Sequence, residues 1–220
     1  IFLISPVYWF TDRQEVILII QAFAAGLSGI FLYSVAKHIL KNKQLSFSIL
    51  ACYFLFVGLQ NAVITEFHEL TVMTLPLMLT LWAAFKNKPV LYFISLIVML
   101  GFKEITFALG ISIGIALFFL KKEWRKYSIA TILLSLLWGF VAFKIIMPHF
   151  SGGRYLYAQN LPEGISGKIM ALVDDPLKQR TLFFSFLSFS FLPFLTPQFW
   201  LAIFQDYASR FMTLYGITRG

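Results

Sequence analysis

The sequence predicts an all-α fold, a polytopic transmembrane helical bundle with about seven spans and one larger extracytoplasmic loop. Of its 220 residues, 59% are hydrophobic and 13% are charged, and the mean hydropathy is +0.80, whereas soluble domains are about 45 to 50% apolar. Long apolar stretches alternate with short polar turns, and basic residues gather in three of those turns. A soluble domain of this size would expose large apolar patches, so a water-soluble enzyme and a nucleic-acid-binding module are excluded.

The predicted spans follow from the uncharged stretches, because roughly 20 residues cross a hydrocarbon core of about 30 Å. The first, second and last stretches are long enough alone, and the sixth becomes so when Lys144 extends its amine outward and the helix runs to Met147. At 1.5 Å per residue the fourth and fifth form a hairpin whose tip lies below the outer surface. The predicted spans are 16–36, 45–64, 66–85, 89–103, 104–120, 127–147 and 177–195.

Basic residues set the predicted orientation, because short cytoplasmic loops are enriched in Lys and Arg. With the three basic turns in the cytoplasm, eight of the ten acidic residues become extracytoplasmic, although only Lys and Arg were used to orient the chain. The three basic clusters are Lys37, Lys41 and Lys43; Lys86 and Lys88; and Lys121, Lys122, Arg125 and Lys126.

The polar segment 148–176 is the predicted outer loop. Asp175 followed by Pro176 predicts an N-cap and a first helical residue. Pro193 and Pro197 interrupt the last apolar stretch, and beyond them we expect an interfacial or partly inserted helix. Because the chain begins at Ile1 and stops without a closing element, we expect a single transmembrane domain fragment that lacks both ends.

The candidate site residues lie in two polar connections between predicted helices, near the outer surface. Glu66, His68 and Glu69 fall in the first turn of the predicted helix 66–85, and Lys103 and Glu104 fall at the tip of the hairpin. An ionised side chain at the bilayer centre costs about 2.5 to 3.5 kcal/mol and less near an interface. Lys103 and Glu104 should therefore face water or partners, and a shared outward-facing cavity would supply both.

Structural interpretations of the same residues stay open. Glu66 and Glu69 would each stabilise the positive end of a helix dipole by about 0.3 to 1 kcal/mol, and Lys103 would pair with Glu69 or with Glu104 as a link between helices. A helix dipole does not explain a histidine at position 68, whereas a role as proton carrier, metal ligand or hydrogen-bond donor to phosphate would explain it. No spacing matches a zinc, P-loop, Rossmann or Ser-His-Asp pattern.

On these residues the sequence resembles an uncharacterised prokaryotic family of multi-spanning membrane proteins, domain of unknown function 2079. The resemblance covers nearly all of the chain. It rests on an ordered set of short motifs: Phe67, His68 and Glu69 at the start of a helix, Lys103 and Glu104 in an apolar stretch, Lys144 and Pro148 before the outer loop, and the proline-containing segment 191–197.

That family resembles the C-type glycosyltransferase (GT-C) superfamily, whose members bind a polyprenyl-phosphate sugar in a cavity open to the outer side. The resemblance implies a multi-pass protein of a prokaryotic plasma membrane that contacts membrane lipid and uses such a donor. Together with the predicted outward cavity, it leads to the hypothesis that Glu69 and Glu104 are catalytic, where they would orient the acceptor, bind a divalent ion or hold Lys103. It also implies substrate binding by Glu66, His68, Lys103 and Arg154. For Arg154 the alternative stays open that it is a loop residue without a role in binding. The superfamily's acidic residue of the first outer loop would lie upstream of Ile1, and whether a divalent metal ion takes part stays open.

Two other classes of function stay open beside a glycosyltransferase. A secondary transporter or flippase-like protein would use His68, Lys103 and Glu104 as an ion or proton relay, and it predicts inverted repeats, which we do not find in the sequence. A non-catalytic membrane scaffold predicts that the same residues tolerate substitution. The sugar, the acceptor and the oligomeric state also stay open.

Overall fold

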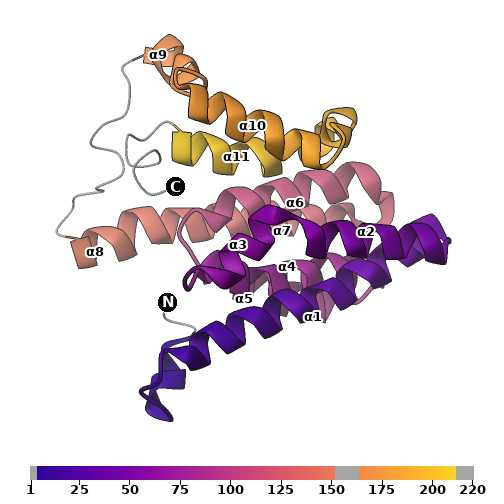
Figure 1. Ribbon diagram of the computed structural model, residues 1–220, viewed down its shortest axis with the longest axis horizontal. Helices are drawn as coiled ribbons and strands as arrows, with labels where there is room; N and C mark the ends of the chain where they lie inside the picture. The colour runs from indigo at the N-terminus through magenta and orange to yellow at the C-terminus, as the bar shows by residue number, and fades with distance from the viewer. Residues whose placement is uncertain (1–3, 152–163, 212–220) are drawn as a thin grey trace. The chain divides into compact units, whose positions relative to one another are not determined.

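The computed structural model of the protein describes residues 4–151 and 164–211 (Figure 1). Within these ranges all regular structure is helical and no strand occurs, which confirms the all-α prediction. The chain divides into two compact units, Ile1–Thr106 and Phe107–Gly220. The single transmembrane domain expected from the sequence stays a prediction.

The first unit consists of antiparallel helices joined by short turns. η1 (Ser5–Trp9) precedes α1 (Glu15–Leu40), and α2 (Lys43–Leu55), α3 (Val57–Ile64), α4 (Glu69–Phe85) and α5 (Pro89–Leu100) follow. Helix α1 packs along α4 and α2, and α5 packs along α4. Lys41 directly after α1 and Asn87 in the turn after α4 have φ values of 52° and 56°. This is the left-handed conformation that is common at helix ends.

Small residues and side-chain hydrogen bonds hold α1 against its neighbours. A Cβ on Gly29 would lie 2.6 Å from the ring of Phe54, so only glycine allows this approach of α1 to α2. The indole of Trp82 on α4 donates a hydrogen bond to Ser34 on α1 at 2.9 Å. Lipid tails are as apolar as the side chains, so close packing and interhelical hydrogen bonds drive association of such helices.

The contact between α4 and α5 buries large side chains. Tyr92, Leu96 and Met99 of α5 are fully buried. Between the two helices the hydroxyl of Thr80 donates to that of Ser95 at 2.9 Å, so the polar atoms in this contact are satisfied.

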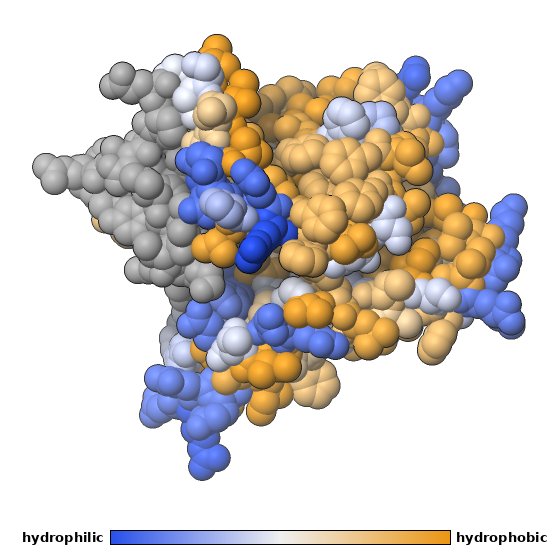
Figure 2. Space-filling model, turned by 45° about the horizontal axis from the view of Figure 1, so that its top comes forward, coloured by the Kyte–Doolittle hydropathy of each residue, from blue (hydrophilic) through white to orange (hydrophobic). Residues whose placement is uncertain are grey.

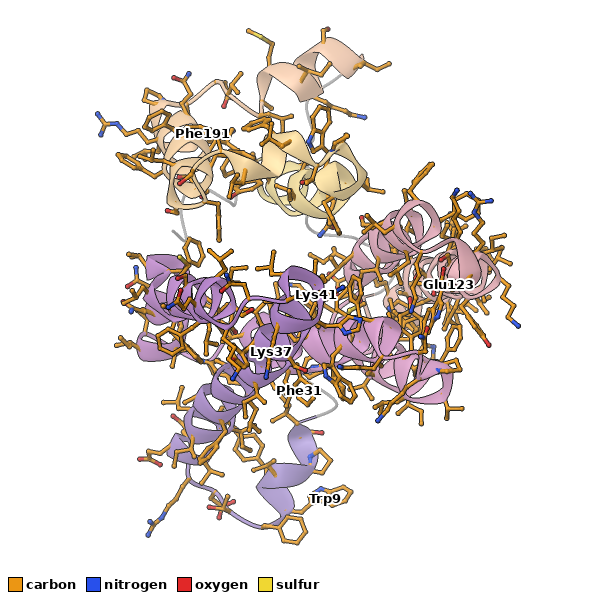
Figure 3. The ribbon with its side chains drawn as sticks, turned by 90° about the vertical axis from the view of Figure 1, so that its right-hand side faces the viewer. Trp9, Phe31, Lys37, Lys41, Glu123 and Phe191 are labelled. Carbon is orange, nitrogen blue, oxygen red and sulfur yellow. The ribbon has the colours of Figure 1, made fainter. Side chains whose placement is uncertain are left out.

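The two ends of the first unit carry opposite charge, because the chain reverses direction after α1, after the α2–α3 pair, after α4 and after α5. One end, the basic end, holds the α1–α2 and α4–α5 turns with Lys37, Lys41, Lys43, Lys86 and Lys88; Figure 3 labels Lys37 and Lys41 near the C-terminal end of α1. The other end, the acidic end, holds the α3–α4 and α5–α6 connections with Glu66, Glu69 and Glu104. This is the separation of charge that the predicted orientation requires.

The second unit opens with two closely packed helices, α6 (Thr106–Leu120) and α7 (Arg125–Val141), joined through η2 (Lys122–Trp124). A Cβ on Gly114 would lie 2.6 Å from Ile132, and one on Gly139 would lie 2.9 Å from the ring of Phe107. The approach of α6 to α7 therefore depends on a glycine in each helix.

Helix α7 continues through a π-helical turn, η3 (Ala142–Ile146), into α8 (Met147–Ser151). The predicted end of this helix before Pro148 is therefore wrong. Proline has no amide hydrogen, and its ring opposes the carbonyl four residues earlier, here that of Lys144. A wider π turn directly before the proline relieves both problems, so the helix continues.

The remaining described helices of the second unit are α9 (Gly164–Met170), α10 (Pro176–Ser188) and α11 (Trp200–Phe211), with short η5 (Leu192–Leu195) and η6 (Pro197–Phe199) between the last two. The carboxylate of Asp175 accepts a hydrogen bond from the Leu177 amide at 2.7 Å. The predicted N-cap, with Pro176 as first helical residue, is confirmed.

The predicted continuous helix 177–195 is wrong beyond Ser188. Ser190 and Phe191 have φ values of 52° and 57°, and the chain turns there. The turn brings the ring of Phe194 to 4.5 Å and that of Phe204 to 5.8 Å from the ring of Phe186. The chain therefore turns back so that these rings pack together, and the helix does not continue straight to residue 195. The helix expected after Pro197 is present as α11.

Two described helices are long and apolar enough to cross a membrane, Glu15–Leu40 and Lys122–Phe150. The pair α2 and α3 is a third candidate if its bend of 47° lies within one crossing. The predicted continuous helix 45–64 is thus broken at Phe56, and the amide of Gln60 donates to the Phe54 carbonyl at 2.9 Å beside the break. Helices α4, α5 and α6 are apolar but shorter, so seven spans stay a prediction.

Exposed apolar side chains are frequent on both units, Phe23 and Ile30 on α1 and Leu133 and Phe140 on α7 among them. Figure 2 shows hydrophobic side chains over much of the face in view, with hydrophilic groups at its edges and in clusters near its middle. An apolar exterior of this extent is unfavourable in water and favourable in lipid.

Candidate functional site

The predicted site residues, except Arg154, come from the two connections at the acidic end of the first unit. Glu66 and His68 lie between α3 and α4, Glu69 is the first residue of α4, and Lys103 and Glu104 lie between α5 and α6. Arg154 falls outside the described residues. The prediction that α4 begins at Glu66 is wrong by three residues, because His68 has an extended backbone and is the N-cap.

Gln21 of α1 determines where α4 begins, and the sequence analysis did not single it out. Its amide is fully buried and donates to the carbonyls of Ala62 and Glu66 at 2.8 and 3.1 Å. Its carbonyl accepts from the backbone amide of His68 at 2.6 Å. One side chain therefore joins the end of α3, the connection and the N-cap of α4.

A signal for Gln21 was present in the sequence. It is the only amide side chain in the uncharged stretch 16–36, and polar side chains inside membrane helices hydrogen-bond to neighbouring helices. Its partners are backbone groups of another segment, which have no signature of their own in the sequence.

Glu69 and Lys103 form the ionic contact that links the two connections. The Lys103 ammonium lies 3.5 Å from the Glu69 carboxylate, and their side chains are 33% and 22% exposed. Of the alternatives that the sequence left open, the structure therefore contains the pair between helices. A partly desolvated pair interacts more strongly than a surface pair, because less water screens it.

The backbone of the α5–α6 connection orients Lys103 and Glu104. The hydroxyl of Thr106 donates to the carbonyls of Leu100 and Lys103 at 2.8 and 2.6 Å, which holds the connection in a tight turn. Glu104 is partly exposed and makes no ion pair within residues 4–151 and 164–211. Of the two carboxylates on α4 and the α5–α6 connection, Glu69 pairs with Lys103, and Glu104 has no ion-pair partner among the described residues.

His68 and Glu66 are a more exposed pair at the same end. The imidazole Nε2 lies 3.9 Å from the Glu66 carboxylate, and the side chains are 44% and 78% exposed. At this distance and exposure the contact contributes little to stability, so both groups remain able to contact a ligand. In the part of the chain that the structure describes, no three His, Cys, Asp or Glu side chains are grouped as a metal site.

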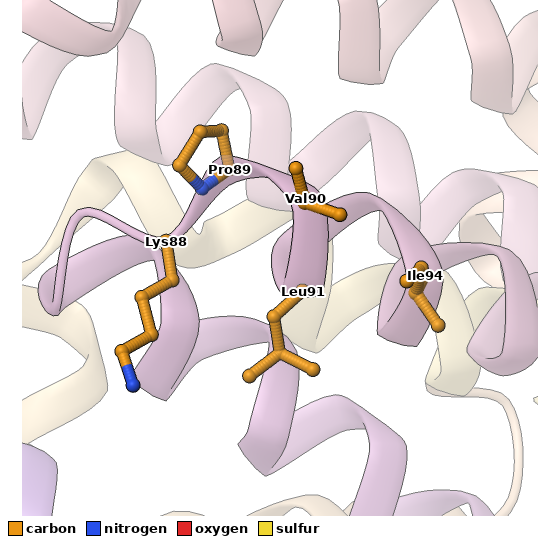
Figure 4. A pocket seen from close by; sticks show the side chains of 5 residues that line it. All are labelled: Lys88, Pro89, Val90, Leu91 and Ile94. Atoms are coloured by element: carbon orange, nitrogen blue, oxygen red, sulfur yellow. The ribbon is translucent and has the colours of Figure 1, made fainter.

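An open hollow of about 430 Å³ lies at the other, basic end of the first unit (Figure 4). Its lining contains none of the predicted site residues and is apolar apart from one amine: Lys88, Pro89, Val90, Leu91 and Ile94. The Lys88 ammonium lies 4.8 Å from the ring of Trp82. A hollow with this lining suits an acyl chain better than a polar substrate.

Apolar helices with exposed hydrophobic faces and a small charged cluster at one end define a helical membrane protein. The chain belongs to the family described as predicted membrane protein (DUF2079), whose model matches residues 1–213. No curated protein and no solved structure matches the chain.

Proposed function

We propose that this membrane protein is a GT-C-like glycosyltransferase that takes a sugar from a polyprenyl phosphate on the extracytoplasmic side of a prokaryotic plasma membrane. The observation that carries the proposal is the partly exposed pair of Lys103 and Glu69 at the acidic end, where Glu104 follows Lys103 in the sequence. An ammonium and carboxylates on the same two connections supply the charges that glycosyl transfer from a lipid phosphate needs.

In the proposed reaction the bond between the sugar C1 and the phosphate oxygen breaks, and the acceptor oxygen bonds to C1. The Lys103 ammonium stabilises the departing polyprenyl phosphate as a point charge. The acceptor proton passes to a carboxylate, Glu104 or Glu69. His68 donates a hydrogen bond to the phosphate and Glu66 orients the acceptor, while Arg154 is proposed as a second phosphate ligand.

The test is binding of a polyprenyl phosphate and of its sugar conjugate to the full-length protein in lipid. Lys103→Ala should weaken binding about 10- to 100-fold, the equivalent of one hydrogen bond between charged groups. Lys86→Ala is the matched control, since Lys86 is exposed at the basic end and outside the hollow, and it should bind as the wild type does. Absence of saturable binding, or equal binding by Lys103→Ala, would contradict the proposal.

A second measurement separates chemistry from binding. Glu104→Gln keeps the size and hydrogen-bonding capacity of the side chain but accepts no proton, so it should retain donor binding and lose sugar transfer. Glu69→Gln should weaken both, because it also leaves Lys103 without its carboxylate. Full transfer activity in both variants would exclude catalytic roles for these carboxylates.

The break between α2 and α3 favours a second candidate, a secondary transporter or flippase-like protein. Such proteins build substrate sites from discontinuous helices, and these two helices are bent by 47°. In proteoliposomes a transporter would move substrate in response to a pH gradient and would form no glycosidic product. A scaffold would show neither activity and would tolerate Lys103→Ala and Glu104→Gln.

A further inference from the structure

The turn between α6 and α7, residues 121–127, holds cations against aromatic rings. The Lys121 ammonium lies 4.5 Å from the ring centre of Trp124, and that of Lys126 lies 4.9 Å from that of Tyr127. The Arg125 guanidinium lies 5.0 Å from the ring of Phe118 in the last turns of α6. All three distances fall within the range of about 6 Å over which a ring attracts a cation.

Trp124 anchors this arrangement. It is only 3% exposed, and its ring centre lies 5.1 Å from that of Tyr127. Arg125 and Lys126 are exposed, so these two cations lie against aromatic rings and remain accessible to a ligand. Packing restricts their side chains before any ligand arrives, which lowers the entropy cost of binding.

The turn carries a net positive charge, which favours binding of an anion. Residues 121–127 contain four basic side chains and one acidic side chain, Glu123, a net charge of +3; Figure 3 labels Glu123 at this turn. Burial lowers the pKa of Lys121 from its ordinary value, although Glu123 acts in the opposite direction. A bound anion would favour the charged form of Lys121.

The surface next to the turn is apolar. Phe119 and Leu120 at the end of α6 are 68% and 48% exposed, and Ile129 and Leu133 on α7 are also exposed. Inorganic phosphate or a nucleic acid would use only the cations, whereas a phospholipid places its phosphate on the cations and its acyl chains on this surface.

We infer that the α6–α7 turn is a binding site for an anionic phospholipid, with Arg125 and Lys126 contacting the headgroup phosphate and Phe119 and Leu120 contacting the acyl chains. This inference is independent of the proposed transferase activity, since the turn contains none of the proposed catalytic or donor-binding residues. It places the lipid on the cytoplasmic side in the predicted orientation.

The chain contains a matched control for this site. The α1–α2 turn is also basic, with Lys37, Lys41 and Lys43, and the predicted orientation puts it on the same side of the membrane. These three lysines make no ring contact with any described residue. A general attraction of anionic lipid to positive charge would act on both turns. A binding site formed by cations on aromatic rings would bind the lipid at the α6–α7 turn alone.

The experiment is native mass spectrometry of the full-length protein in detergent, titrated with phosphatidylglycerol or phosphatidylcholine. We expect phosphatidylglycerol to bind about fivefold more tightly, the effect of about 1 kcal/mol from a single additional cation contact. The double variant with Arg125→Gln and Lys126→Gln should lose the preference. The control with Lys41→Gln and Lys43→Gln should keep it, as should Lys126→Arg, which preserves the charge.

Three outcomes would overturn the inference. The first is equal binding of the two lipids by the wild type, and the second is a control variant that loses the preference as fully as the double variant does. Displacement of phosphatidylglycerol by millimolar inorganic phosphate would show that the turn recognises a free anion. All substituted side chains are exposed, so the variants should fold, and an unchanged circular dichroism melting curve verifies this.

Discussion

Gln21→Leu is the substitution that tests the architecture of the acidic end most directly. Leucine has a similar volume but removes the three hydrogen bonds that the buried amide makes to Ala62, Glu66 and His68. Helix α1 would then lose its polar link to the connection that leads into α4. The first turn of α4, which carries Glu69, should become less well positioned.

The expected cost is about 2 to 5 kcal/mol of unfolding free energy. Hydrogen bonds between membrane helices average about 0.6 kcal/mol and reach about 1.7 kcal/mol, and three of them are lost. The upper value applies if the carbonyls and the His68 amide stay buried without new partners. The lower value applies if water reaches them.

Steric trapping of the full-length protein in bicelles measures this free energy. Gln60→Leu is the control, because Gln60 is an exposed amide that makes one hydrogen bond, to the Phe54 carbonyl; its cost should not exceed about 1 kcal/mol. Hydrogen exchange over residues 62–70 should accelerate in Gln21→Leu and not in the control. A cost below about 0.5 kcal/mol, or one equal to that of Gln60→Leu, would refute the reasoning.

Two further substitutions test the second unit. The Lys178 side chain is 6% exposed, and its ammonium donates to three oxygens, including the Phe211 carbonyl at 2.9 Å. Lys178→Met should therefore lower the free energy of unfolding by about 1 to 3 kcal/mol and speed hydrogen exchange in α11. Unchanged exchange in α11 would show that this contact does not hold the helix. Gly114→Ala should destabilise the protein, since its Cβ would meet Ile132 at 2.6 Å. Gly26→Ala is the control, because a Cβ at this position has no atom within 4 Å; it should leave stability unchanged or raise it by up to about 1 kcal/mol. Equal melting temperatures for Gly114→Ala and Gly26→Ala would contradict close packing of α6 on α7.

Local signals in the sequence predicted the helix positions well wherever neighbouring residues alone decide them. The N-cap at Asp175 was predictable because its acceptor and the Leu177 amide lie two residues apart. The turns at Lys41 and Asn87 likewise fall in the polar clusters between apolar stretches. Capping and turn formation depend on contacts within a few residues, so they can be recognised without the fold.

Tertiary contacts decided the helix ends that were predicted wrongly. Helix α4 begins at Glu69 and not at Glu66 because Gln21, 47 residues before His68, holds the His68 amide. The helix after Pro176 stops at Ser188 because the rings of Phe186 and Phe204 meet across a turn. An apolar sequence of this kind is compatible with a longer helix, and only packing selects the shorter one.

The sequence by itself determined the class of the protein, a helical membrane protein, because composition and the length of apolar stretches depend only on residue identity. It also indicated which charged residues needed an explanation, since an ionised group in an apolar stretch is costly wherever the helices lie. Only the tertiary structure decided that Lys103 pairs with Glu69 and that Gln21 supports their end of the unit. Ion pairs and hydrogen bonds act over a few ångströms, so residues far apart in sequence interact only once packing has brought their helices together.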